Sequence, residues 1–335
     1  MTTLRLGSRG SHLALFQARL VAERIQGAGG PACDIVVIKT GGDRLQELPL
    51  SEIGGKRLFV KEIEDALVNG DVDLAVHSSK DMPAVLPNGL EIGAVLERED
   101  PRDVLVLPIG PASIVDRPAS QGPESGARNL QPGVPRIGTG SVRRIAQLKK
   151  RFPDGEFLNV RGNLDTRLRK LDSGEYDMLV LASAGLRRLG FGARISASVS
   201  IEDCVPAPGQ GIIAIEIRGN DTQAREAVAR VNNEDAACAL EAERALVAAL
   251  GGGCQMPIGA IAVPIGADGL EMHAVVASLD GSRIIRYTWM GTRREPTALG
   301  RQVAGHLLKQ GAADILREVG QPESLIRDPK SVRNA

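Results

Sequence analysis

Six arginines share one kind of position in this sequence, because each falls at or shortly after the end of a predicted strand. They are Arg9, Arg143, Arg144, Arg161, Arg167 and Arg188. A planar guanidinium pairs bidentately with a carboxylate or a phosphate, and each such charged hydrogen bond is worth roughly 1.5–3 kcal/mol. A single arginine is usually a solvated surface group. Six that converge on one cleft would bind a ligand carrying several carboxylates or phosphates.

The segment AVHSSKDMP (75–83) adds an acid to this basic set. Asp81 follows a predicted strand, at the edge where open parallel sheets bind ligands. Neighbouring arginines would keep its carboxylate ionised, and a fixed carboxylate can stabilise a developing cation or transfer protons. The alternative is a polar loop ending in an Asp-Met-Pro turn, and location alone does not decide between them.

The segment GTGSVRR (138–144) predicts a strand, a glycine-containing turn and the start of a helix. Backbone N–H groups in a first helical turn can receive an anion, and Ser141 adds a hydroxyl. The Walker Gly-Lys-Ser/Thr and the three-glycine dinucleotide pattern are both missing, so a nucleotide is disfavoured. The alternative is a tight turn followed by a solvated basic helix face.

Cys254 lies in LGGGCQMPIGA (250–260), directly after three glycines. It could be a nucleophile, a metal ligand, a covalent attachment point or a buried thiol. The next histidine, His273, is about 20 residues away in a predicted strand, so no catalytic base is evident and a cysteine hydrolase is disfavoured. Without C-x-x-C or H-E-x-x-H spacing, a metal site is also disfavoured. Attachment and a structural thiol stay open, while Cys33, Cys204 and Cys238 are expected to be ordinary free thiols.

Composition limits the function classes. The 335 residues are 43% hydrophobic and 24% charged, with 41 basic and 41 acidic side chains, so bulk charge does not point to nucleic acid or membrane. Aromatic residues make up 2%, which argues against stacking on single-stranded nucleic acid. The N-terminus has no apolar signal core, and no apolar run of about 18 residues could span a bilayer. A cytoplasmic location is therefore expected.

The elements that must position these residues alternate between strand and helix periodicity. Strands are expected over 3–9, 34–40 and 72–78, with helices between them. A Pro-, Gly- and Ser-rich segment, 108–135, predicts an exposed excursion. The same alternation then returns, with strands expected over 135–141, 157–160 and 176–182. This pattern predicts two similar α/β domains with mainly parallel sheets.

The pattern changes after residue 234. An amphipathic helix over 234–250 precedes three expected strands, 258–265, 270–279 and 282–291, and a closing helix over roughly 296–318. This is the pattern of an α+β domain with a small antiparallel sheet. The tail from about 320 is polar.

Seven segments, in this order, resemble the porphobilinogen deaminase family, also called hydroxymethylbilane synthases. They are VHSSKDMP, EREDPRD (97–103), GTGSVRR, RGNLDTRL, AGLRRLG, PAPGQG (206–211) and GGGCQMPIG. The resemblance spans about residues 3–318. It implies two periplasmic-binding-protein-like α/β domains plus a smaller C-terminal α+β domain with an antiparallel sheet. The implied boundaries are 1–105 completed by about 207–228, then 106–206, then 229–320, with a tail over 321–335.

The resemblance also implies the activity. Enzymes of this family are transferases that join four porphobilinogen molecules head to tail, with release of ammonia, to give the linear tetrapyrrole hydroxymethylbilane of porphyrin and heme biosynthesis. One dipyrromethane cofactor per chain primes the reaction, and its thioether linkage is expected at Cys254. A monomer is implied, without metal, nucleic acid or membrane partners, with a possible hand-off to the next enzyme of the pathway.

Site roles follow from matching motif positions. The implied catalytic residue is Asp81. The implied cofactor-binding residues are Cys254, Ser78, Lys80, Asp81, Thr139, Ser141, Arg143, Arg144 and Arg188. The implied substrate-binding residues are Arg9, Ser11, Lys56, Phe59, Arg161, Arg167 and Gln210. Lys56 and Phe59 match a mobile loop, in which Glu52 stands where relatives often have lysine.

A binding module from another class is the alternative reading. A two-domain cleft that closes on a dicarboxylate or an oxyanion fits the arginines equally well. It gives no reason for Asp81 or for the glycine-cysteine loop.

Overall fold

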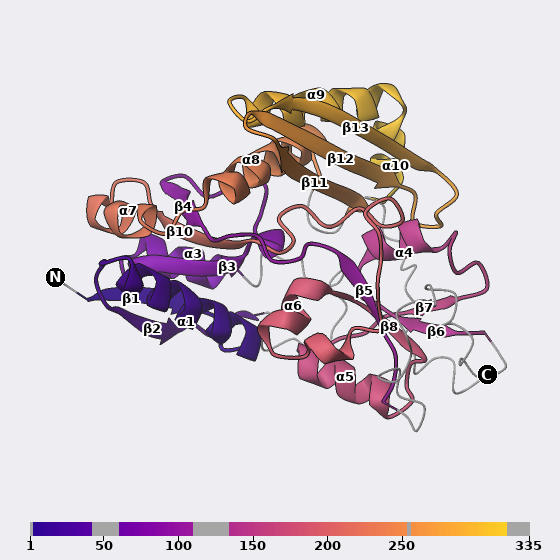
Figure 1. Cartoon of the computed structure of the whole chain (residues 1–335), viewed down its shortest axis with the longest axis horizontal. Coiled ribbons are helices and arrows are strands. Elements are labelled where there is room, and N and C mark those ends of the chain that lie inside the picture. Colours follow the sequence, from indigo (N-terminus) through magenta and orange to yellow (C-terminus); the bar gives the residue numbers. More distant parts are fainter. Residues whose placement is uncertain (1–2, 42–59, 110–133, 253–255, 320–335) are drawn as a thin grey trace.

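The computed structural model describes residues 3–41, 60–109, 134–252 and 256–319. Two parts, each with a five-stranded sheet, lie side by side, and a third part with a three-stranded sheet packs against both (Figure 1). This architecture confirms the fold class expected from the sequence.

The first sheet has the strand order β2-β1-β3-β10-β4. Its strands are β1 (Leu4–Ser8), β2 (Cys33–Val37), β3 (Leu74–Ser78), β4 (Leu90–Val95) and β10 (Ile213–Arg218). Its helices are α1 (His12–Gly27), α3 (Lys61–Val68) and α7 (Thr222–Ala229). Strand β1 pairs in parallel with β2 and β3, as the alternating pattern predicts, whereas β10 runs antiparallel to both β3 and β4.

The second sheet has the order β7-β6-β8-β5-β9. Its strands are β5 (Asp103–Val106), β6 (Arg136–Gly138), β7 (Glu156–Leu158), β8 (Met178–Ala182) and β9 (Ala197–Ser198). Its helices are α4 (Val142–Leu148), α5 (Leu164–Asp172) and α6 (Ser183–Arg188). Strand β6 is parallel to β7 and β8, and β5 is antiparallel to β8 and β9. Each sheet is therefore mainly parallel, with an antiparallel strand inserted.

The chain passes between these two sheets twice. The first crossover, residues 96–102, leads from β4 into β5, and the second, residues 199–212, returns from β9 to β10. Periodicity alone does not predict β4, β5, β9 or β10. The return of the chain to the first sheet was expected only from the family resemblance. The change of sheet falls before Asp103, slightly earlier than the expected boundary at 105.

Two glycines allow the second crossover to pack closely against the first crossover and against the turn after β3. Gly211 has φ +88, and a Cβ there would lie 2.2 Å from the carbonyl oxygen of Glu99 on the first crossover. Gly209 has φ +73, and a Cβ there would lie 2.5 Å from Oγ of Ser79. A positive φ combined with contact this close requires glycine. The PAPGQG segment is thus explained by backbone packing.

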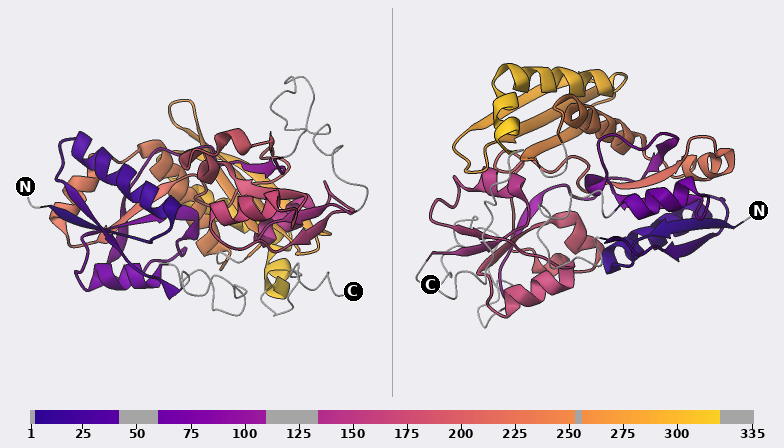
Figure 2. Two further views of the ribbon diagram at one scale, coloured as in Figure 1. Left: turned by 90° about the horizontal axis from the view of Figure 1, so that it is seen from below. Right: turned by 180° about the vertical axis from the view of Figure 1, so that it is seen from behind.

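The third part combines an antiparallel sheet with three helices. Its elements are α8 (Glu234–Ala249), β11 (Ile258–Ile265), β12 (Gly269–Ala277), β13 (Ile284–Thr292), α9 (Pro296–Lys309) and α10 (Ala312–Val319). The three helices pack on this sheet (Figure 2). Their apolar residues form one core with it. The single closing helix expected over 296–318 is wrong, because Gly311 adopts φ +96 and ends α9 before α10 begins.

One buried carboxylate joins the third part to both crossovers. Glu243 of α8 is fully buried and accepts two hydrogen bonds from Arg98, at 2.7 and 2.8 Å. It also accepts from the backbone N–H groups of Gly209, at 2.6 Å, and Ala262, at 2.8 Å. A buried charge with four donors is well compensated. The three parts are therefore fixed at the point where both crossovers meet.

Two negative findings apply to the described ranges alone. No helix within them is long and apolar enough to cross a bilayer. The same ranges contain no group of three or more His, Cys, Asp or Glu residues arranged to hold a metal ion.

Candidate functional site

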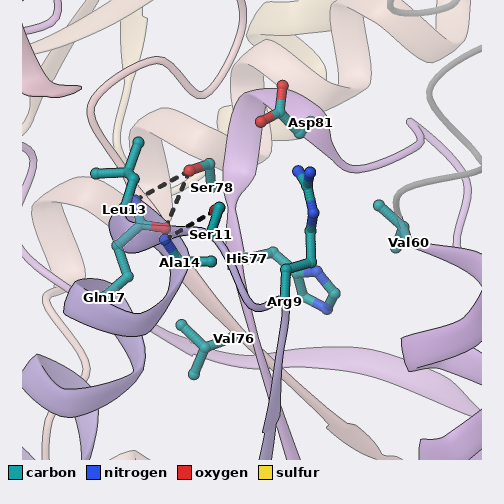
Figure 3. A pocket seen from close by; sticks show the side chains of 10 residues that line it. All are labelled: Arg9, Ser11, Leu13, Ala14, Gln17, Val60, Val76, His77, Ser78 and Asp81. Carbon is teal, nitrogen blue, oxygen red and sulfur yellow. Dashed lines mark hydrogen bonds between the residues drawn. The ribbon is translucent and has the colours of Figure 1, made fainter. Parts of the chain in front are cut away.

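A pocket opens where β1 and β3 end, and Asp81 lies at its rim (Figure 3). Its lining residues are Arg9, Ser11, Leu13, Ala14, Gln17, Val60, Val76, His77, Ser78 and Asp81. Arg9 directly follows β1, and Asp81 ends the short 3-10 turn Ser79–Asp81 after β3. Figure 3 shows the side chain of Arg9 extending toward the carboxylate of Asp81. The structure thus brings together residues that are about 70 positions apart in the sequence.

Hydrogen bonds fix the helix side of this pocket. Ser11 caps α1 by accepting a hydrogen bond from the backbone N–H of Ala14 at 3.3 Å. Ser78 exchanges hydrogen bonds with the amide of Gln17, at 2.9 and 3.1 Å. Sequence reasoning missed Gln17. Its signal was a polar residue on the otherwise apolar face of α1, next to Ala18 and Val21.

The second part contributes Arg167, which lies close enough to Asp81 for the two charges to interact. Burial, together with repulsion by Arg144 and Arg161, lowers the pKa of Arg167 to about 10, and the Asp81 carboxylate opposes this shift. Burial also lowers the pKa of Arg161, whose Nε–H donates no hydrogen bond to any of the described residues. The Asp81 carboxylate of the first part therefore interacts with the Arg167 guanidinium of the second part.

Arg188, at the end of α6, is a further half-buried arginine of the second part. Burial lowers its pKa to about 10, and it donates a hydrogen bond to the carbonyl oxygen of Gly211 at 2.6 Å. Within the described ranges, no carboxylate lies at ion-pair distance from Arg161, Arg167 or Arg188. A pKa near 10 leaves a guanidinium charged at neutral pH. Buried cations without a carboxylate partner favour an anionic ligand.

Arg143 and Arg144 have a different environment. Both pair with the fully buried Asp103 of β5, at 2.7 and 2.8 Å. Burial alone would raise the pKa of Asp103, but the two guanidinium groups outweigh it and hold this pKa well below its usual range. Arg144 lies close enough to Arg167 to lower the pKa of that arginine. These two arginines therefore adjoin the cleft with their charge partly neutralised inside the protein.

Asp103 is the second residue that sequence reasoning missed. It belongs to the EREDPRD segment, and it begins a strand whose other residues are apolar. An acid in a buried strand requires a buried cation. Gln210, expected to contact substrate, donates to Asp103 at 2.9 Å and to the carbonyl oxygen of Pro101 at 2.6 Å. It lies between the crossovers and is not part of the pocket lining.

The remaining expected site residues fall into two groups. Thr139 is buried after β6, and its Oγ1 accepts a hydrogen bond from the backbone N–H of Ser141 at 3.3 Å. Lys80 lies in the turn that ends at Asp81. Lys56, Phe59 and Cys254 lie outside the described residues.

The three described cysteines are free thiols. Burial raises the pKa of Cys33 to about 11 and that of Cys204 to about 12, and it also raises the pKa of Cys238. The thiolate is the nucleophilic form, so these cysteines are poor nucleophiles at neutral pH.

Comparison with known proteins adds two family matches. Residues 4–226 match the family described as "Porphobilinogen deaminase, dipyromethane cofactor binding domain", and residues 237–309 match "Porphobilinogen deaminase, C-terminal domain". A porphobilinogen deaminase of Syntrophobacter fumaroxidans is 45% identical over 318 residues, covering 94% of this chain and 97% of the relative. One of Moorella thermoacetica is 44% identical over 320 residues, covering 95% and 97%.

Solved structures add a distant likeness. The VFT2 domain of BvgS from Bordetella pertussis is 13% identical and aligns with a TM-score of 0.39, covering 68% of this chain and 86% of that chain.

Proposed function

This chain belongs to the porphobilinogen deaminase family, and from that premise we propose how its own residues carry out the reaction. The enzyme joins four porphobilinogen molecules head to tail, releases ammonia and forms hydroxymethylbilane, a linear tetrapyrrole on the route to heme. Its cofactor is dipyrromethane. The alternative of a dicarboxylate-binding module is not favoured.

The observation that supports our residue assignment is a set of half-buried arginines without ion-pair partners in the described ranges, of which Arg167 interacts with Asp81. Each pyrrole of substrate and cofactor carries an acetate and a propionate, so a bound chain of pyrroles presents many carboxylates to the cleft. Arg161, Arg167 and Arg188 are half-buried without an ion-pair partner in the described ranges, and the Nε of Arg161 lacks any hydrogen bond there. These residues therefore fit a dipyrromethane, because its carboxylates supply the missing anions.

Asp81 is the catalytic residue of this proposal. When bound, the dipyrromethane supplies the free pyrrole α-carbon to which the first substrate unit is added. Asp81 accepts hydrogen bonds from pyrrole N–H groups and stabilises the positive charge that the incoming unit develops as ammonia departs. The arginines keep Asp81 ionised and hold the carboxylates of the pyrroles in place, so the reacting carbons approach in a fixed orientation.

The remaining roles follow the family motifs. We propose that the cofactor is bound by Ser78, Lys80, Asp81, Thr139, Ser141, Arg143, Arg144 and Arg188, with its thioether at Cys254. We propose that the substrate is bound by Arg9, Ser11, Lys56, Phe59, Arg161, Arg167 and Gln210. For Arg143 and Arg144, the pairing with Asp103 supports a role in which this carboxylate orients both guanidinium groups beside the cofactor.

The domain boundaries, 1–105 with about 207–228, 106–206 and 229–320, are also proposals. The placement of β10 in the first sheet and β5 in the second supports this division, with the change at Asp103. We further propose a monomer in a reducing compartment such as the cytoplasm, which the three free thiols support. A hand-off of hydroxymethylbilane to the next enzyme of the pathway rests on the place of the family in tetrapyrrole synthesis.

Mass spectrometry of the intact, reduced protein tests the attachment at Cys254. We expect a mass excess equal to two linked pyrrole units, located by digestion on the peptide that contains Cys254. Cys254→Ser should fold yet lack this adduct and lack turnover, whereas the matched control Cys238→Ser should keep both. If the wild-type protein is unmodified, porphobilinogen is added and the mass is measured again. A mass that still does not change, or full activity in Cys254→Ser, would contradict the proposed anchor.

A further inference from the structure

We propose that His77 is the proton-transfer residue of the pocket, held in place by the buried carboxylate of Glu216. This inference rests on the proposed function. His77 lies in β3, four residues before Asp81, and its ring lines the same pocket (Figure 3). Its side chain is only 4% exposed, so a substrate could reach it only through this pocket.

The contact that holds His77 comes from the inserted strand β10. Nε2 of His77 lies 3.0 Å from Oε2 of Glu216, which is fully buried. Ala214 of β10 pairs with His77 in the sheet register, so Glu216 reaches the ring from a neighbouring strand. The pair is thus built by two segments that are about 140 positions apart in the sequence.

The second oxygen of Glu216 argues against a purely structural pair. Oε1 is buried and accepts no hydrogen bond from any residue that the structure describes. A buried acceptor left unsatisfied is unfavourable for folding. Glu216 shares its face of β10 with Ala214, which is apolar and fully buried. A buried carboxylate with an unsatisfied oxygen points to a role in function.

Glu216 also determines which nitrogen of His77 can act. A carboxylate accepts a hydrogen bond, so Nε2 carries the proton and the lone pair stays on Nδ1. The pair then has a charge of −1, and a proton taken up at Nδ1 brings it to zero. This is the arrangement in which a carboxylate orients a histidine base.

The condensation needs such a base. The new bond joins the methylene carbon of the incoming unit to the free α-carbon of the terminal pyrrole, and the bond to the departing ammonia breaks. The α-carbon then loses its proton, and the electrons of that C–H bond return to the ring. Asp81 must stay ionised to stabilise the cationic unit, so protonating it would weaken its own role. Nδ1 of His77 takes the proton and passes it to the released ammonia, which leaves as ammonium.

Porphobilinogen deuterated at its free α-carbon tests this step. We expect His77→Gln to lower turnover roughly 100-fold and to show a larger primary isotope effect than the wild type, because proton removal becomes limiting. The matched control is His273→Gln, since His273 pairs with Glu271 at the same 3.0 Å but lies in the third part, outside the pocket. It should leave both quantities unchanged. Unchanged turnover in His77→Gln, or lower turnover with an unchanged isotope effect, overturns the proposal.

A second measurement does not depend on turnover or on the folding of a variant. Ring ¹⁵N spectra of histidine-labelled wild-type protein, without added substrate, should show His77 with a protonated Nε2 and an unprotonated Nδ1 at neutral pH. Two protonated nitrogens would overturn the proposal, because the ring could accept no further proton. Glu216→Gln should change this tautomer preference. If the wild-type protein does not convert porphobilinogen at all, the proposed function fails first, which separates the two failures.

Discussion

The arginines of the cleft differ in what neutralises them. Arg143 and Arg144 share the carboxylate of Asp103, whereas Arg161 and Arg167 have no ion-pair partner in the described part of the chain. A guanidinium with a protein partner is positioned before a ligand arrives, and one without a partner gains most from a ligand carboxylate. The cleft therefore contains two kinds of arginine: those that a carboxylate of the protein positions in advance, and those that gain a partner only when a ligand binds.

Asp81→Asn tests the central carboxylate, because it keeps the shape and removes the charge. Turnover should fall by about 100- to 1,000-fold, the loss expected when one preorganised stabilising group is removed. The cofactor adduct should persist, since the arginines still bind its carboxylates. Steady-state assays with adduct mass measurement would check this, with Asp154→Asn, in an exposed turn, as the control. Near-normal turnover in Asp81→Asn would exclude Asp81 from the mechanism.

Residue types at strand ends were sufficient to predict the cleft's cations and Asp81 as a group. The buried partners of the site residues could not be predicted from the sequence, because they depend on contacts between distant segments. Asp103 meets Arg143 only through the pairing of β5 with β8, and Glu216 meets His77 only because β10 enters the first sheet. Gln17 could have been found as a polar residue on a buried helix face, whereas these pairs could not.

At the scale of elements, the strands and helices with clear periodicity were predicted, and the crossovers were not. Strand β8 is a continuous apolar run, and β1 and β3 are mostly apolar, which is a strong local signal. Strand β10 is also mostly apolar, but no local feature of its sequence predicts that it lies between β3 and β4. The break between α9 and α10 was missed because one glycine inside a helical pattern is often tolerated.

Gly211→Ala tests the contact between the crossovers. Gly211 and Gly190 both have positive φ, +88 and +76, but a Cβ at Gly190 meets nothing within 4 Å. Gly190→Ala should therefore cost about 1 kcal/mol of unfolding free energy, the conformational penalty alone. Gly211→Ala should cost clearly more, because the carbonyl of Glu99 must move. It should also raise KM, since Arg188 is bound to the carbonyl of Gly211.

Urea unfolding and steady-state kinetics of both variants would measure these effects. Equal losses of stability in the two variants would contradict the idea that the crossovers are packed too tightly for a side chain. An unchanged KM in Gly211→Ala would separate the position of Arg188 from this contact.

At the scale of the whole molecule, Asp103 links acid stability to the crossovers. Its pKa lies below the usual range in the folded protein, so the unfolded chain binds the proton more readily. Its stabilising contribution is complete above about pH 5 and is lost as the pH falls through the unfolded value of about 3.9 toward the folded one. Asp103→Asn should therefore lower stability by about 3–5 kcal/mol near neutral pH, and the deficit should shrink on acidification.

Urea unfolding of wild type and variant from about pH 3 to pH 7 would measure this difference. The control is Asp203→Asn, which removes a surface pair with Arg151 and should cost at most about 1 kcal/mol. A deficit that grows on acidification would mean that Asp103 is not the ionised partner of the two arginines.

The place of β10 in the first sheet also has a consequence for synthesis of the chain. Strands β3 and β4 are both made before residue 96, yet the strand that joins them ends at Arg218. At ribosomal rates, roughly 10 seconds separate the two events. During that interval the nascent chain presents two unpaired apolar edges, which are sites of aggregation. The order of translation therefore makes the first sheet, which begins first, one of the last structures to close, and gives chaperones a defined interval in which to act.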